Sequence, residues 1–123
     1  MKKFLLVLLF AVSSLRAVVV DLNDKEFDAA VLSSPIPVIV KLYTPRCGAC
    51  IDFKQPFILA SNMLSQYKFV ELDIVKNSRI RERYQVRGVP SVLFFWKGKL
   101  IYRHTGSMSV KQLSELTKQY FSA

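Results

Sequence analysis

The sequence predicts an α/β domain in which one mixed sheet carries helices on both faces. Strand-like and helix-like apolar patterns alternate along the chain, which is typical of a sheet with helices packed against it. The run at residues 38–43 is apolar on both faces except at Lys41, as expected for a central strand. A Lys97-Gly98 turn between two later strand-like runs indicates a hairpin, which adds antiparallel pairing.

The first strand and helix are predicted before the chain reaches two prolines. Residues 18–20 are β-branched and read as a short strand. Asn23 or Asp24 can cap the helix that follows, and we expect this helix to end near Leu32. The Ser- and Pro-rich stretch at residues 33–37 stops it.

The second strand and the second helix meet at a short turn. Residues 38–43 form the strand, residues 44–46 end it, and a helix is predicted from near Cys47 to about Leu64. Pro56 falls inside this helix and should kink it, because its ring removes one backbone hydrogen bond.

The second half of the domain repeats the alternation and then closes with the hairpin. Residues 68–73 alternate and predict a strand, and residues 78–84 predict a short, arginine-rich helix. Residues 91–96 and 99–104 form the two strands of the hairpin. The final helix, at residues 109–121, begins with a capping-box pattern.

The first 17 residues are interpreted as a secretory signal peptide. Two lysines precede an uninterrupted apolar run at residues 4–12, and small residues follow as far as Ala17. The run is shorter than the ~20 apolar residues that span a bilayer. We therefore expect cleavage after Ala17 or Ser13, with an uncleaved anchor or a buried strand as the alternative. The predicted division is a signal peptide at residues 1–17 and one domain at residues 18–123.

Composition limits the partners and the cofactors. The formal charge of +9 falls to +6 once the three basic residues of the signal peptide are removed, which favours acidic partners. No pattern of basic and stacking aromatic residues is present, so we expect no nucleic-acid partner. We expect no cofactor or metal, because two cysteines and a distant His104 do not supply the about four ligands of a zinc site. One basic cluster reads either as a solvated helix face or as a site for an acidic partner: Arg79, Arg81, Arg83 and Arg87.

The two cysteines of the chain form the motif Cys47-Gly48-Ala49-Cys50, where a strand turns into a helix. A disulfide that closes so short a loop stabilises little, because the entropic effect grows with loop length. The pair therefore indicates reversible thiol–disulfide exchange, with an inert structural pair as the alternative. A position at a helix N-terminus favours the Cys47 thiolate, and Arg46 adds a neighbouring positive charge.

Further motifs surround the cysteine pair. They are Phe27-Asp28, Val31-Leu32 and Pro37-Val38 upstream, Leu42-Tyr43-Thr44-Pro45-Arg46 directly before the pair, and Val86-Arg87-Gly88-Val89-Pro90-Ser91, Phe94-Phe95 and Lys97-Gly98-Lys99 downstream. Together they resemble the thioredoxin superfamily, and most of all a single catalytic domain of a protein disulfide isomerase. The resemblance implies a thioredoxin fold, a mixed sheet of about five strands flanked by about four helices.

The same resemblance implies roles for four residues. Cys47 is the exposed attacking thiol and Cys50 the more buried resolving thiol. Val89-Pro90 resembles the family's cis-proline loop, which faces the cysteines and offers backbone to an extended substrate. An X–Pro bond adopts cis at little cost, and an ordinary trans turn proline is the alternative.

The sequence also departs from the family at several positions. Lys41 stands where relatives place a buried acid near the resolving cysteine, and Arg46 replaces the usual tryptophan, so we expect both to tune the thiols. We predict that Lys41 extends its ammonium to water, the alternative being a buried neutral amine that acts as a base. Pro56 lies one residue later than the family's helix proline. Ala49 replaces the histidine of isomerases and the proline of thioredoxins, which leaves the redox direction open.

The predicted function is a secreted thiol–disulfide oxidoreductase that exchanges disulfides with protein substrates through Cys47 and Cys50. The expected partners are proteins with thiols or disulfides and an unidentified redox partner, and we expect a monomer without a stable membrane anchor. No Lys-Asp-Glu-Leu-type signal ends the chain. The expected location is the secretory pathway, either the endoplasmic reticulum lumen or outside the cell, or the periplasm of a bacterium. The alternatives are a thioredoxin-fold adaptor in an export assembly and a redox-sensing binding module.

Overall fold

The computed structural model describes residues 19–122, so the predicted signal peptide at residues 1–17 lies outside the described residues. The strands are β1 (Val20–Leu22), β2 (Val38–Tyr43), β3 (Lys68–Asp73), β4 (Ser91–Trp96) and β5 (Lys99–Thr105). The helices are α1 (Asp24–Phe27), η1 (Asp28–Leu32), α2 (Gly48–Met63), α3 (Ser78–Arg83) and α4 (Val110–Phe121). Within residues 19–122, none of these helices combines the length and apolarity needed to cross a bilayer.

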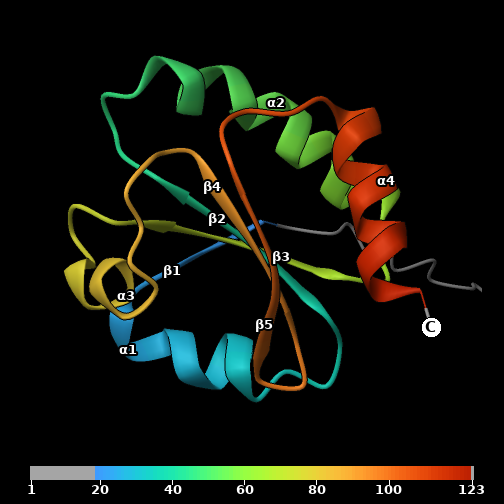
Figure 1. Cartoon of the computed structure of the whole chain (residues 1–123), viewed down its shortest axis with the longest axis horizontal. Coiled ribbons are helices and arrows are strands. Elements are labelled where there is room, and N and C mark those ends of the chain that lie inside the picture. Colours follow the sequence, from blue (N-terminus) through green and yellow to red (C-terminus); the bar gives the residue numbers. More distant parts are fainter. Residues whose placement is uncertain (1–18, 123) are drawn as a thin grey trace, which may run out of the picture.

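The strands form one sheet in the order β1-β3-β2-β4-β5 (Figure 1). β3 pairs in parallel with β1 and with β2, whereas β4 pairs antiparallel with both β2 and β5. β2 therefore lies at the centre, which explains why its residues are apolar on both faces. The predicted mixed sheet of five strands is confirmed.

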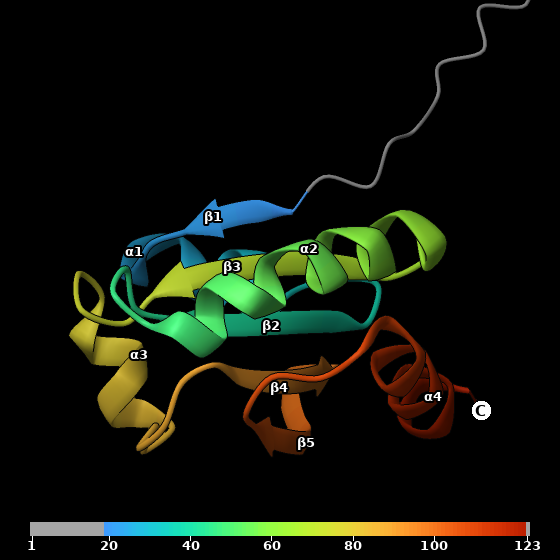
Figure 2. The ribbon, with the colours of Figure 1, turned by 90° about the horizontal axis from the view of Figure 1, so that it is seen from above.

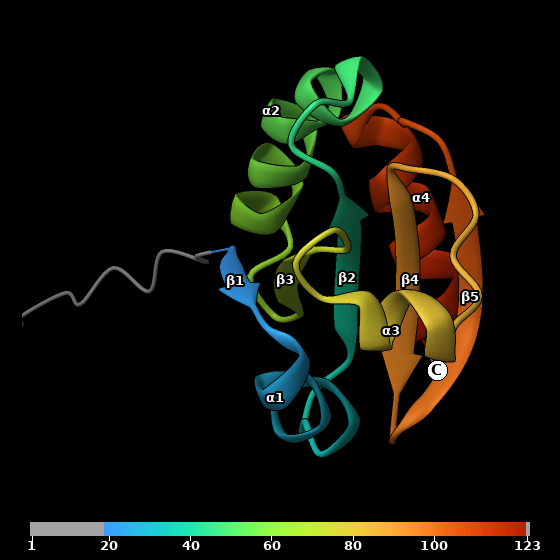
Figure 3. The same ribbon diagram turned by 90° about the vertical axis from the view of Figure 1, so that its left-hand side faces the viewer.

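Two layers of helices cover the sheet, and Figures 2 and 3 show them on opposite faces. α1, η1 and α3 cover one face, where Phe27, Val31 and Ile80 pack against inward-facing residues of the strands. α2 and α4 cover the other face, where Phe53, Phe57, Ala60, Leu64 and Leu113 pack against Ile39, Phe69, Val92 and Phe94. Alternate residues of β2 belong to the two layers, so Ile39 and Lys41 face α2.

Most local predictions hold, with two exceptions. Asn23 caps α1 with a reciprocal capping box to Glu26, and α2 begins at its cap Cys47 and continues through Pro56. The first strand, predicted at residues 18–20, is instead Val20–Leu22, because its position is decided by pairing with Val70, Glu71 and Leu72 of β3 rather than by the β-branched run alone.

The other exception is the end of the first helical segment. The helix predicted to end near Leu32 does end there, but its last turn is wider than an α-helix. The N–H of Ser33 donates a hydrogen bond to the carbonyl of Asp28, five residues earlier, at 3.1 Å. A hydrogen bond of this spacing is typical of a π-helix, so the segment ends in a π-type turn.

Candidate redox site

The cysteine pair lies at the carboxyl end of β2, where the chain turns into α2. Cys47 is the N-cap of the helix, and its Sγ accepts a hydrogen bond from the backbone N–H of Cys50 at 3.1 Å. The two residues are joined as a disulfide, with their Cα atoms 5.1 Å apart. Cys47 is half-buried, whereas Cys50 is 5% exposed. The structure thus places one sulfur at the surface and the other behind it.

The loop before β4 lies directly against the half-buried sulfur. The Sγ of Cys47 lies 3.7 Å from the carbonyl oxygen of Val89, and the Val89–Pro90 peptide is cis, as predicted. Two hydrogen bonds fix the loop, since Ser91 Oγ donates to the Gly88 carbonyl at 2.6 Å and Gly106 N–H donates to the Pro90 carbonyl at 2.7 Å. Residues 42 positions apart in sequence therefore form one site.

Gly88 has a specific reason to be glycine. A Cβ atom at this position would lie 2.9 Å from the methyl carbon of Thr105 on β5, closer than real Cβ contacts allow. The cis-proline loop therefore packs tightly against the hairpin, which holds Val89 beside Cys47.

Lys41 does not reach water, and this prediction was wrong. The residue is 3% exposed, and its Nζ lies 2.9 Å from Oε2 of Glu71, which stands beside it on β3 in the parallel register. The ammonium also lies 4.9 Å from the centre of the Phe57 ring of α2. A side chain on this face of a central strand meets the covering helix before it can reach solvent, and the carboxylate across the strand pair replaces water as its partner.

Glu71 was missed by the sequence analysis. Its strand alternates as expected, but nothing local indicates which residue of β2 stands opposite, since that depends on the register of two strands about 30 residues apart. A buried lysine in a central strand was itself the available signal, because such a charge requires an opposite charge nearby.

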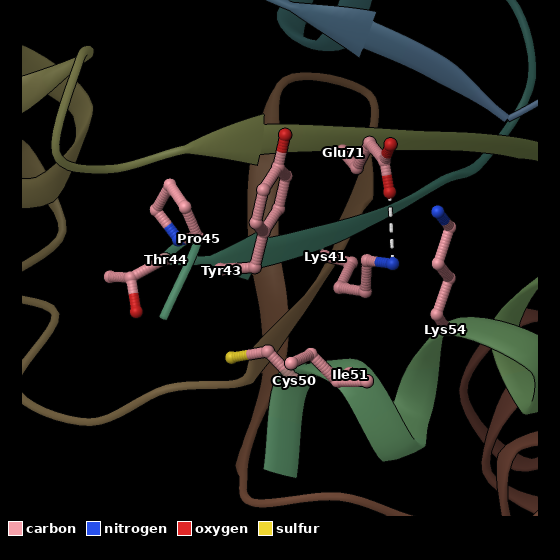
Figure 4. A pocket seen from close by; sticks show the side chains of 8 residues that line it. All are labelled: Lys41, Tyr43, Thr44, Pro45, Cys50, Ile51, Lys54 and Glu71. Carbon is pink, nitrogen blue, oxygen red and sulfur yellow. Dashed lines mark ion pairs between the residues drawn. The ribbon is translucent and has the colours of Figure 1, made fainter. Parts of the chain in front are cut away.

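A cavity of about 190 Å³ connects the charged pair with the redox site. It is lined by Lys41, Tyr43, Thr44, Pro45, Cys50, Ile51, Lys54 and Glu71 (Figure 4). In this view the Lys41 ammonium points toward Glu71, and the Cys50 sulfur points the other way. Lys41 therefore pairs with a carboxylate that lines the same cavity as the resolving cysteine, and it does not point at the sulfur itself.

Burial and the carboxylates around the end of β2 both raise the pKa of Tyr43. Burial raises the pKa of Tyr43 to about 12, and the negative charges of Asp21, Glu71 and Asp73 act in the same direction. Burial also raises the pKa of Asp21, with the charges of Glu71 and Asp73 contributing. These groups therefore disfavour additional negative charge on this side of the sheet.

We expect a pH-dependent loss of stability that belongs to Tyr43. Between the ordinary phenol value of about 10 and the folded value of about 12, the folded chain keeps a proton that the unfolded chain has released. The free energy of unfolding should therefore fall as the pH rises through this window. Urea unfolding of the wild type and Tyr43→Phe across the window measures it. The difference between the two should change in this window and stay constant below it, and a constant difference throughout would contradict the assignment.

Comparison with known proteins agrees with this geometry. The thioredoxin family model matches residues 18–119. A thioredoxin of Haemophilus influenzae is 26% identical over 83% of this chain and 96% of its own length. Protein disulfide-isomerase 1 of Caenorhabditis elegans is 28% identical over 88% of this chain, which spans 24% of that longer protein. The crystal structure of a thioredoxin from Malassezia sympodialis superposes with a TM-score of 0.78 at 21% identity, covering 87% of this chain and 94% of that one.

The fold and the cysteine pair define a thioredoxin-fold protein with a Cys-x-x-Cys redox centre. The chain belongs to the thioredoxin family and is a thiol–disulfide oxidoreductase. Within residues 19–122, no group of three or more histidine, cysteine or acidic side chains could hold a metal ion.

Proposed function

We propose that this chain exchanges disulfides with protein substrates, with Cys47 as the attacking thiol and Cys50 as the resolving thiol. One observation carries the proposal: the Cys47 sulfur is partly exposed beside the Val89 carbonyl, whereas Cys50 is buried behind it. An incoming disulfide can therefore reach Cys47 first, and Cys50 is positioned for the second attack.

The exchange balances as a two-electron transfer in either direction. The Cys47 thiolate attacks a substrate disulfide, forms a mixed disulfide and releases one substrate thiolate. Cys50, deprotonated, then attacks the mixed disulfide, which closes the Cys47–Cys50 bond and releases the second substrate sulfur as a thiolate. Two electrons have then passed to the substrate, and its two thiolates take up protons from solvent that match those lost by Cys47 and Cys50. The reverse sequence oxidises a substrate dithiol and leaves both cysteines reduced.

Three features support a reactive thiolate at Cys47. The N-terminus of the 16-residue helix α2 presents unpaired N–H groups and the positive end of the helix dipole. The Cys50 N–H already points at the Cys47 sulfur at 3.1 Å, a bond that would strengthen once the sulfur carries a negative charge. Arg46 is exposed and directly precedes Cys47, so it adds a positive charge without burying it.

The backbone at Val89 is the proposed anchor for the substrate. Its carbonyl lies beside the Cys47 sulfur in a part-buried position. An extended substrate chain that brings its cysteine to Cys47 would pass this backbone and could pair with it, as strands pair at a sheet edge.

Export of the chain is part of the proposal. The basic start, short apolar run and small residues of the first 17 residues support it. Mass spectrometry of the protein from its native source should find an N-terminus after residue 13 or 17. An intact Met1 would contradict export by cleavage.

Two assays on the same preparation test the function. The reduced chain should accelerate the reduction of insulin by dithiothreitol, and a mixture of reduced and oxidised chain should restore activity to a protein with scrambled disulfides. Reduction without refolding would assign a thioredoxin-like reductase, and refolding would assign an isomerase. Activity in neither assay would overturn the proposal and favour a binding module.

A further inference from the structure

We propose that two arginine-lined grooves beside the redox site bind acidic segments of the protein substrate. The chain would then exchange disulfides preferentially with cysteines that are flanked by Asp or Glu. This inference rests on the proposed function, because the grooves select a substrate only if Cys47 attacks it.

The first groove lies beside the turn that leads to Cys47. It has a volume of about 400 Å³ and is lined by Thr44, Pro45, Arg46 and Val75. Pro45 and Val75 are exposed apolar side chains, and Arg46 supplies the one charge. The groove therefore suits a segment that combines apolar side chains with a carboxylate.

The second groove shares Val89 with the redox site. It has a volume of about 230 Å³ and is lined by Thr44, Ile74, Arg81, Val86, Arg87, Gly88 and Val89. Thr44 belongs to both grooves. Val89 also lies against the Cys47 sulfur at 3.7 Å. A substrate chain bound at Cys47 therefore has two arginine-lined grooves near it, one at the turn that precedes Cys47 and one at the loop that contains Val89.

The structure divides the predicted arginine cluster into two parts. Arg83 forms an ion pair with Asp28 at 2.6 Å on the α1 side of the molecule. Among residues 19–122 the other ion pair is Lys41–Glu71, so Arg46, Arg81 and Arg87 have no carboxylate within 4.0 Å in this part of the chain. All three are exposed, and no acidic residue lines either groove. These guanidinium groups are therefore available to carboxylates of a substrate.

The selectivity would act on the first chemical step. The Cys47 thiolate attacks a disulfide sulfur of the substrate, a new S–S bond forms, and the partner sulfur leaves as a thiolate with both bonding electrons. Carboxylates held by Arg81 and Arg87 would raise the local concentration of the substrate at Cys47 and orient it. Arg46 is excluded from the test variants, because its charge also acts on the Cys47 thiolate.

The test compares peptides that differ only in charge. Each peptide carries one cysteine as a mixed disulfide with a chromophoric thiol, and the cysteine is flanked by glutamates, by glutamines or by lysines. The Cys50→Ser chain is used, so that Cys47 attack releases the chromophore and stops at the mixed disulfide. Each rate is divided by the rate of the same peptide with 2-mercaptoethanol, which removes intrinsic differences in disulfide reactivity.

We expect the normalised rate to be about threefold to tenfold higher for the glutamate peptide than for the lysine peptide at low salt, as for exposed ion pairs. When Arg81→Gln/Arg87→Gln is combined with Cys50→Ser, the ratio should fall at least twofold, and what remains is due to Arg46 in the first groove. At 1 M salt, where the screening length is ~3 Å, the ratio should approach one. The matched control is Lys111→Gln/Lys118→Gln, which removes the same charge from α4, at the far end of the molecule from α3 (Figure 1).

The outcomes separate the inference from the proposed function. Three results would overturn the inference. The glutamate-to-lysine rate ratio could be near one in Cys50→Ser itself, it could be unchanged by the arginine substitutions, or it could fall equally with the α4 control substitutions. Equal mixed-disulfide formation with all three peptides would leave the proposed function intact. Failure to form a mixed disulfide with any peptide would instead overturn the proposed function.

Discussion

Replacing Cys47 by serine should lower turnover in the insulin assay by at least about 10³-fold, the scale expected when a covalent nucleophile is removed. The hydroxyl of serine does not ionise near neutral pH, so the first attack on the substrate disulfide is lost. Because Cys47 is the partly exposed sulfur beside Val89, buried Cys50 cannot take over the attack. Single-turnover mixing of the reduced variant with excess substrate measures this step directly.

Cys50→Ser should give a different result from Cys47→Ser. Its turnover should also fall, but it should accumulate a mixed disulfide between Cys47 and the substrate, because resolution has lost its thiol. Ala49→Ser serves as the matched control, since it adds a hydroxyl to the same exposed turn and should change turnover far less. Mixed disulfides that accumulate in Cys47→Ser rather than in Cys50→Ser would reverse the roles of the two cysteines.

Lys41→Met should destabilise the oxidised chain by about 1–3 kcal/mol. Removing one partner of a buried ion pair costs about 3–5 kcal/mol, and the 24% exposure of the Glu71 side chain reduces this value because water can partly solvate the carboxylate. The methionine keeps most of the apolar volume beside Phe57, so the loss should report the charge rather than a cavity. Urea unfolding at neutral pH measures the difference.

Exchanging the two charges is the control for this prediction. The double variant Lys41→Glu/Glu71→Lys keeps an ion pair between β2 and β3 and restores at position 41 the acid expected from the resemblance. It should recover most of the stability lost in Lys41→Met and in Glu71→Gln. Single variants as stable as the wild type would show that the pair contributes nothing.

The same variants test whether Lys41 takes part in the chemistry. Its ammonium points toward Glu71 and away from the Cys50 sulfur, so we expect the rate of mixed-disulfide resolution in Lys41→Met to change little (Figure 4). A large loss of this rate, recovered in Lys41→Glu, would show that position 41 moves protons for Cys50.

The local sequence predicted most of the fold because its signals are themselves local. The strands at 38–43, 68–73 and 91–96 have the predicted bounds, since runs of β-branched and aromatic residues end at turn residues on both sides. The Lys97-Gly98 hairpin adopts positive φ at both turn residues, 53° and 77°, as a tight turn requires. The redox pair was identified for the same reason, because its spacing and flanking residues are contiguous.

Contacts between distant segments could not be predicted in this way. The partner of Lys41 depends on the register between β2 and β3, and the division of the arginine cluster depends on Asp28 of η1 lying near Arg83 of α3. The π-type turn at the end of η1 also gave no local signal, because residues 28–32 are ordinary helix formers. For Lys41 and Arg83 the outcome was decided by contacts between elements rather than by the propensity of one segment.

The most direct test of the central claim is the rate of alkylation of each cysteine as a function of pH. Reduced Cys47→Ser and Cys50→Ser are treated with iodoacetamide from acid to alkaline pH, and the modified residue is identified by mass spectrometry. The helix N-terminus and Arg46 should keep Cys47 as thiolate at lower pH, so Cys50→Ser should be modified faster throughout the acid range. Faster modification of Cys50 in that range would contradict the assignment of Cys47 as the attacking thiol.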